Sequence, residues 1–67
     1  MATAAERFAV ALGHYRAGRG GEARRVCREI AASDGRFAPA QAMLGMMALR
    51  ENDLDEAERR FALASAA

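Results

Sequence analysis

Two side chains in the 67-residue sequence have chemistry that an enzyme or a metal site often uses, namely His14 and Cys27, the only imidazole and the only thiol. A catalytic triad needs a nucleophile and an acid within reach of the histidine, and no Ser, Asp or second His lies in helical register with His14. A zinc site needs several Cys or His ligands, and one cysteine excludes an internal disulfide. We therefore expect no enzyme, metal or cofactor here. His14 is expected to be a half-buried packing residue and Cys27 a small buried one.

A cluster of basic residues gives the strongest indication of nucleic-acid binding. Arg24, Arg25 and Arg28 stand at positions i, i+1 and i+4 of a helical pattern. Glu22 and Glu29 are interleaved with them, and the chain as a whole has a net charge of only +1. Nucleic-acid-binding domains are usually much more basic on one face. We expect a solvated face and no nucleic-acid partner; a small helix-turn-helix binder is the alternative from another class.

The acidic and glycine-rich segments do not match known ion or phosphate sites. The acids between residues 51 and 58 lack the 12-residue ligand pattern of a calcium loop, and they suit the N-terminus of a helix electrostatically. The glycines between residues 18 and 21 lack the Lys-Ser or Lys-Thr of a phosphate-binding loop. Neither segment predicts a ligand.

Length and composition limit the class of protein. A chain of 67 residues is one domain, 1–67, and such a short domain buries a thin core, which favours a homo-oligomer or further repeats. Hydrophobic residues make up 52% of the chain, too many for a disordered tail. No apolar run approaches the roughly 20 residues of a membrane span, and the N-terminus has no signal-peptide pattern. We expect no membrane insertion and a cytoplasmic location.

The residues above must be positioned by helices, because Ala, Leu, Arg, Glu and Met dominate and no strand pattern is present. A Thr3-x-x-Glu6 capping box predicts the first helix, over about 4–17. Glycine and proline then divide the remainder into helices over about 21–33, 39–51 and 54–66. Pro39 suits the first position of the third helix, and Asp53 can cap the fourth. Turns this short make neighbouring helices antiparallel, so an all-α fold of two helical hairpins is expected.

The two hairpins repeat each other at a spacing of 34 residues. Glu22-Ala23 aligns with Glu56-Ala57, and Arg25 aligns with Arg59. Val10-Ala11 aligns with Leu44-Gly45, and Gly18 aligns with Asn52 within a turn. Gly and Asn are the residue types that tolerate a left-handed backbone conformation. We expect Gly45 and Ala57 to be small because the helices of the second hairpin cross there, with Phe61 beside the crossing.

This period resembles that of the tetratricopeptide repeat, a family with one helical hairpin in each repeat of 34 residues. The residues that carry the resemblance are Leu44-Gly45, Asn52-Asp53-Leu54, Ala57, Phe61 and Ala64 in the second copy. It gives repeat 1 over about 4–37 and repeat 2 over about 38–67, in an α-solenoid. The first copy departs from the family's pattern, with Gly20 after the turn and Cys27 in place of an aromatic residue. The family normally needs about three repeats and a capping helix, which predicts that Leu63 and the flank of Phe61 are exposed.

The resemblance implies that the first helix of each repeat lines a concave groove that binds a protein or peptide partner. Helical spacing selects the residues for such a groove, because one stripe on each helix must then be core. We assign Val10, Ala11 and His14, and Leu44, Met47 and Ala48, to the core. The groove residues are then Phe8, Leu12, Tyr15, Arg16, Ala42, Met46, Leu49 and Arg50.

An apolar groove flanked by arginine suits an amphipathic helix or an apolar peptide segment. Family members that grip the carboxylate end of a chaperone tail use Lys and Asn where this chain has Phe8 and Leu12, so that mode is disfavoured. The same stripe would equally suit packing against a further helix or a second copy of the chain. A further alternative, also from the resemblance, is the non-catalytic N-terminal arm of a larger bacterial enzyme such as a glycosyltransferase or sulfotransferase.

Overall fold

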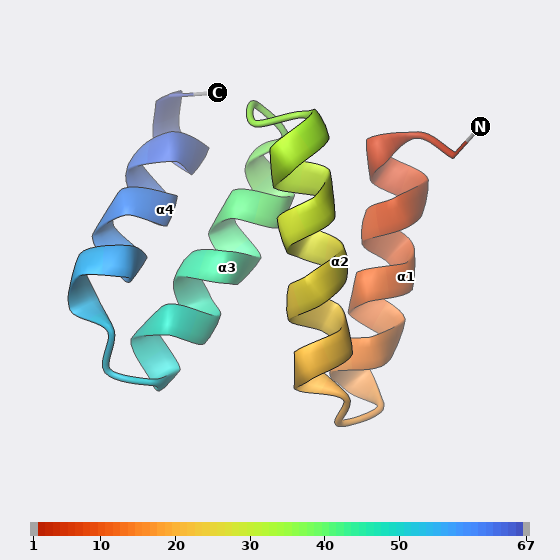
Figure 1. The fold of residues 1–67 in the computed structure, drawn as a ribbon, viewed down its shortest axis with the longest axis horizontal. Coiled ribbons are helices and arrows are strands. Elements are labelled where there is room, and N and C mark those ends of the chain that lie inside the picture. The colour runs from red at the N-terminus through yellow and green to blue at the C-terminus, as the bar shows by residue number, and fades with distance from the viewer. Residues whose placement is uncertain (1, 67) are drawn as a thin grey trace.

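A computed structural model describes residues 2–66 and contains four α-helices arranged side by side (Figure 1). The helices are α1 (Ala4–Arg16), α2 (Gly20–Ser33), α3 (Ala38–Arg50) and α4 (Leu54–Ala66). No strand occurs within residues 2–66. The all-α prediction is confirmed, and the helix boundaries agree with the sequence-based ones to within one or two residues. No helix in this range is both long and apolar enough to cross a membrane.

The helix starts have the caps that the sequence predicts. The Thr3 hydroxyl accepts a hydrogen bond from the Glu6 amide at 3.1 Å, and the Glu6 carboxylate accepts one from the Thr3 amide at 2.8 Å. The Asp53 carboxylate accepts from the Glu56 amide at 3.3 Å at the start of α4. Pro39 is the second residue of α3, since the helix begins one residue earlier than expected. Each bond satisfies an amide that has no partner within the helix.

The two turns within the hairpins have equivalent backbone conformations. Gly18 has φ of 82° and Asn52 has φ of 62°, both in the left-handed region. These turns reverse the chain, so that α1 and α2 are antiparallel, as are α3 and α4 (Figure 1). The prediction that both positions adopt this conformation is confirmed, and it supports the 34-residue register of the two hairpins.

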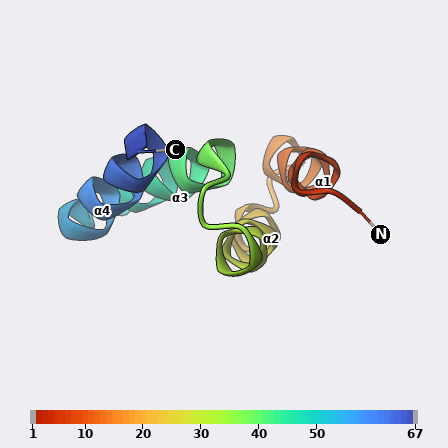
Figure 2. The same ribbon diagram turned by 90° about the horizontal axis from the view of Figure 1, so that it is seen from above.

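The helices pack in chain order, α1 on α2, α2 on α3 and α3 on α4. Viewed from above, α1 and α3 lie on the same side of the molecule, and α2 lies on the other (Figure 2). The core combines several alanines with Met43, Leu44 and Met47, and Ile30 and Cys27 are the largest side chains with no exposed surface. Full burial of a Leu, Ile or Met side chain contributes about 1.5–3 kcal/mol, so these few residues supply most of the hydrophobic stabilisation.

Equivalent positions in the two hairpins agree at the helix crossings and differ on the outside. Ala23 and Ala57 are both buried, as expected. A Cβ atom placed on Gly45 would lie 3.0 Å from the Phe61 ring, so the small residue at this crossing is explained. The assignment of Val10 to the core is wrong, because its side chain is 54% exposed whereas Leu44 is 4% exposed. Both α2 and α4 pack extensively on the helix of Leu44, whereas the extensive packing on the helix of Val10 is by α2 alone.

Candidate binding groove

The third helix is apolar around almost its whole circumference. Gln41 and Arg50 are its only residues with polar side chains. Its buried side faces α2 and α4, and on the remaining side Met46 is 47% exposed and Leu49 is 53% exposed. A helix that is apolar all round is normally covered on all sides. The exposed side of α3 is therefore an apolar surface that would gain from being covered.

The matching stripe on α1 lies next to this surface but is less exposed. Phe8, Leu12 and Tyr15 are half-buried and pack against the core. The Phe8 ring meets the Phe37 ring edge to face, with centroids 5.8 Å apart and an interplanar angle of 65°. At the other end of the helix, the Tyr15 hydroxyl accepts a hydrogen bond from Arg50 Nη1 at 2.7 Å. These contacts connect α1 to the two ends of α3 and leave the apolar stripes of both helices on one side.

The equivalent residues Leu12 and Met46 differ in exposure because their neighbours differ. Leu12 packs against the core, whereas Met46 is 47% exposed. Ala42 is half-buried, and Arg16 and Arg50 are exposed. The eight groove residues chosen from the sequence thus form a half-buried part on α1 and a mainly exposed part on α3, and their role as a binding site stays a prediction.

The basic end of the groove opens into a cleft. This cleft has a volume of about 460 Å³ and lies between the first turn and the C-terminal end of α3. Tyr15 and Arg50 belong to both the groove and the cleft. Arg24 and Glu51 form an ion pair at its edge. The bond from Arg50 to Tyr15 uses one of the guanidinium nitrogens, so other N–H groups are free to bind an acceptor at this end.

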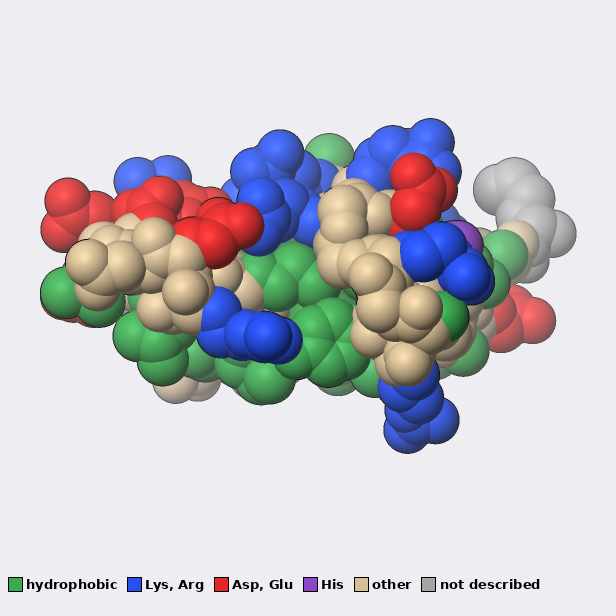
Figure 3. Space-filling model, turned by 90° about the horizontal axis from the view of Figure 1, so that it is seen from below, with side chains coloured by type: hydrophobic (Ala, Val, Ile, Leu, Met, Phe, Trp, Pro, Cys, Tyr) green, Lys and Arg blue, Asp and Glu red, His purple; other side chains and the backbone are tan. Residues whose placement is uncertain are grey.

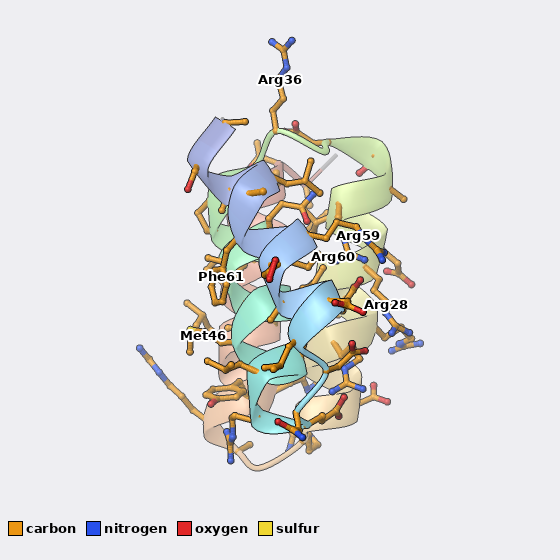
Figure 4. The ribbon with its side chains drawn as sticks, turned by 90° about the vertical axis from the view of Figure 1, so that its left-hand side faces the viewer. Arg28, Arg36, Met46, Arg59, Arg60 and Phe61 are labelled. Atoms are coloured by element: carbon orange, nitrogen blue, oxygen red, sulfur yellow. The ribbon has the colours of Figure 1, made fainter. Side chains whose placement is uncertain are left out.

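The sequence-based selection missed one residue that borders the groove. Phe61 of α4 places one part of its ring on Gly45, and its side chain is 36% exposed. Met46 and Phe61 project on the same side of the α3–α4 hairpin, away from Arg28 and Arg59 (Figure 4). Phe61 was expected beside the helix crossing with an exposed flank, which is confirmed. Its contribution to the groove depends on a contact across two helices, which helical spacing alone does not reveal.

The opposite side of the molecule is charged and largely ion-paired. In the view of Figure 3, hydrophobic side chains follow the lower edge, interrupted by arginines, while charged side chains crowd the upper edge. Arg25 pairs with Glu22 at 2.9 Å, and Arg59 and Arg60 pair with Glu56 at 2.9 and 2.7 Å. The hydrogen bond from Arg60 holds the pKa of Glu56 below its usual value, against a smaller opposing effect of burial. These carboxylates compete with any phosphate for the arginines.

His14 and Cys27 have structural surroundings. His14 is half-buried, as expected, and its Nδ1 accepts a hydrogen bond from Arg19 Nε at 3.0 Å. Cys27 is fully buried, with its sulfur 3.4 Å from the sulfur of Met43, and burial raises the pKa of the thiol. A raised pKa makes a thiol less reactive. Within residues 2–66, no group of three His, Cys, Asp or Glu side chains is placed to hold a metal ion.

No protein-family model matches this sequence, and no curated protein or solved structure matches it either. The interpretation of the groove therefore depends on the internal repeat and on the geometry described above.

Proposed function

We propose that this chain is a non-catalytic protein-interaction module of the tetratricopeptide type, and that its apolar groove binds an amphipathic helix of a partner protein. The 34-residue register supports the repeat assignment, since both inner turns are left-handed and both central alanines of the crossings are buried. A helical hairpin for each repeat is the arrangement expected of that family. The proposal concerns the surface formed by α1 and α3.

The observation that carries the proposal is the exposed apolar side of α3. Met46 and Leu49 are about half exposed on a helix whose other sides are buried. Burying apolar surface contributes about 25 cal/mol for each Å² removed from water. Methionine is unbranched and polarizable, so Met46 adapts to partners of different shape. A helix that places residues i, i+4 and i+7 on this surface would cover both side chains.

Charge sets the orientation of the proposed partner helix. Arg16 and Arg50 lie at one end of the apolar stripes, and both are exposed. A guanidinium binds a carboxylate with two parallel hydrogen bonds. The partner is therefore an amphipathic helix whose apolar face is followed at one end by Asp or Glu. Its acidic end lies over Arg50, whose position the Tyr15 hydroxyl helps to fix.

The methionine methyl groups provide a direct test with an internal control. The probe is a helical peptide with Leu at i, i+4 and i+7 and two Asp residues at one end, compared with a scrambled peptide of the same composition. In NMR spectra of the chain with methyl-labelled methionine, we expect the designed peptide to shift the Met46 signal. Met43 and Met47 are buried and should shift much less. No shift at Met46, or equal shifts with both peptides, would refute the proposal.

Paired variants separate binding from folding. Met46→Glu places a charge at an exposed position, so we expect helicity to be retained and peptide binding to weaken at least about tenfold, or about 1.4 kcal/mol. Ala32→Glu makes a similar change on an exposed part of α2 and should bind as the parent chain does. Leu12→Glu should lower stability as well, because Leu12 packs on the core. Unfolding of Met46→Glu would show that Met46 is a core residue.

A further inference from the structure

The junction between the two hairpins shows how helices of this sequence pack across a repeat boundary. Three pairs of residues define it: the sulfur of Met43 lies 3.4 Å from that of Cys27, Met47 and Gly20 line the same cleft, and Arg24 forms an ion pair with Glu51. In the first two pairs, α3 supplies the large side chain and α2 supplies the small one. The residues 34 positions away from these lie on the two outer flanks of the molecule.

The outer flank of α1 presents small residues where α3 presents large ones. Ala9 is equivalent to Met43, Gly13 to Met47, and Val10 to Leu44. All three residues on α1 are exposed, and nothing lies within 4 Å of a Cβ atom placed on Gly13. Glycine inside a helix is less favourable than alanine, and it permits the close approach of another helix. A smooth, shallow flank is the result.

The outer flank of α4 presents large residues where α2 presents small ones. Phe61 is equivalent to Cys27 and Leu54 to Gly20. Both Phe61 and Leu54 are among the exposed large hydrophobic residues, and the extensive packing of α4 is on α3. Figure 4 looks onto this side of α4, with Phe61 at its edge. At the inner junction the large side chains are on α3 and the small ones are on α2. At the outer flanks the large side chains are on α4 and the small ones are on α1.

The charges are exchanged as well. Arg24 of the inner junction is equivalent to Glu58 on α4, and Glu51 is equivalent to Ala17. Ala17 lies between two exposed basic residues, Arg16 and Arg19. At the inner junction a basic residue of α2 pairs with Glu51, the residue that follows α3, whereas at the outer flanks the acidic residue Glu58 is on α4 and the basic residues are at the end of α1. Opposite charges across a contact select the partner and its orientation.

We propose that a second copy of this chain docks its α1 flank on the α4 flank of the first, in the way that α3 docks on α2. The small Ala9 and Gly13 then receive Phe61 and Leu54, and Glu58 of one copy approaches Arg16 or Arg19 of the next. The contact joins two different surfaces, so it is heterologous, and each added copy leaves a free flank at both ends of the assembly. Phe61 borders both the α4 flank and the groove, whereas Ala9, Gly13 and Leu54 are not groove residues, so variants at these three positions test the proposal without changing the groove.

Two double variants block one flank each. Ala9→Gln/Gly13→Gln fills the α1 flank, and Leu54→Gln/Ala62→Gln alters the α4 flank. All four positions are exposed, and glutamine is a good helix former without charge, so neither variant disturbs folding or creates a new ion pair. Ala32→Gln, on an exposed part of α2, is the control. Sedimentation velocity of each protein, over concentrations up to about 1 mM, gives the association constants.

The parent chain and the control should form species that grow with concentration beyond a dimer. Each double variant should associate at least about tenfold more weakly with itself. An equimolar mixture of the two variants should form a one-to-one complex and nothing larger, because each retains the flank that the other has lost. A parent chain that remains at its monomer mass of 7.2 kDa throughout would overturn the proposal. Dimers that persist in both variants, or a mixture without the one-to-one complex, would also overturn it.

Discussion

Two glycines, Gly13 and Gly45, each lie inside the first helix of a hairpin and are expected to respond in opposite directions to the same substitution. Both lie inside a helix, where alanine is favoured over glycine by about 1 kcal/mol. At Gly13 a Cβ atom meets nothing within 4 Å, so Gly13→Ala should stabilise the fold by about 0.5–1 kcal/mol.

At Gly45 the added methyl group collides with an aromatic ring. Its Cβ would lie 3.0 Å from Cε1 and Cζ of Phe61 and 3.1 Å from Cδ1. Carbon atoms prefer a separation of about 3.5–4.0 Å, so the ring must move by about half an ångström or more. Overfilling a packed contact costs about 1–3 kcal/mol, which outweighs the gain in helix propensity. Gly45→Ala should therefore destabilise the fold by about 1 kcal/mol.

Thermal unfolding followed by circular dichroism separates the two outcomes. A change of 1 kcal/mol shifts the midpoint by about 4–8 °C in a domain of this size, with Gly13→Ala moving up and Gly45→Ala moving down. Phe61→Leu removes the ring edge, so Gly45→Ala should cost less in that background, giving a measurable coupling between the two sites. If Gly45→Ala raised the midpoint as much as Gly13→Ala does, the close crossing of α3 and α4 would be wrong.

Three other properties follow from single contacts. Because Arg60 lowers the pKa of Glu56 in the folded chain, this pair stabilises the fold at pH values above the ordinary pKa of 4.5, and the stabilisation is lost as the pH falls. The unfolding midpoint should therefore decrease more between neutral and acidic pH in the parent chain than in Glu56→Gln. A disulfide reagent should modify the buried Cys27 slowly in buffer and rapidly in urea, and rapid modification in buffer would contradict its burial. Gly18→Ala should lower stability by about 1 kcal/mol in urea unfolding, because φ at this position is 82°, while Asn52→Gly should be tolerated.

The features that the sequence predicted well are determined by a few neighbouring residues. The capping box of Thr3 and Glu6 closes within one turn of helix, and the left-handed conformations of Gly18 and Asn52 are properties of those residue types. The close helix crossing at Gly45 was also predictable. Small residues at equivalent positions of the two copies, such as Ala23 and Ala57, indicate that two helices approach each other closely there. Each of these predictions needs only local geometry and the 34-residue register.

The prediction failed where burial depends on which helices are present beside a residue. Val10 has the same helical position as Leu44, yet one is exposed and the other is buried. A repeat predicts that two residues point in the same direction relative to their own hairpin. It does not predict what they meet in that direction, because the neighbour belongs to another repeat. The same reasoning explains why Met46 is more exposed than Leu12.

These failures are informative about function, because an exposed residue whose equivalent is more buried marks a place where the fold lacks a neighbour. Val10 marks such a place on α1, and Met46 marks another on α3. The two places make different demands on a partner. The flank of α1 is small and is bordered by basic residues, which suits the larger, acidic flank of α4. The surface around Met46 and Leu49 is apolar and about half exposed, and methionine adapts to partners of different shape. We therefore propose another copy of this chain as the partner of the first surface and a helix of a different protein as the partner of the second.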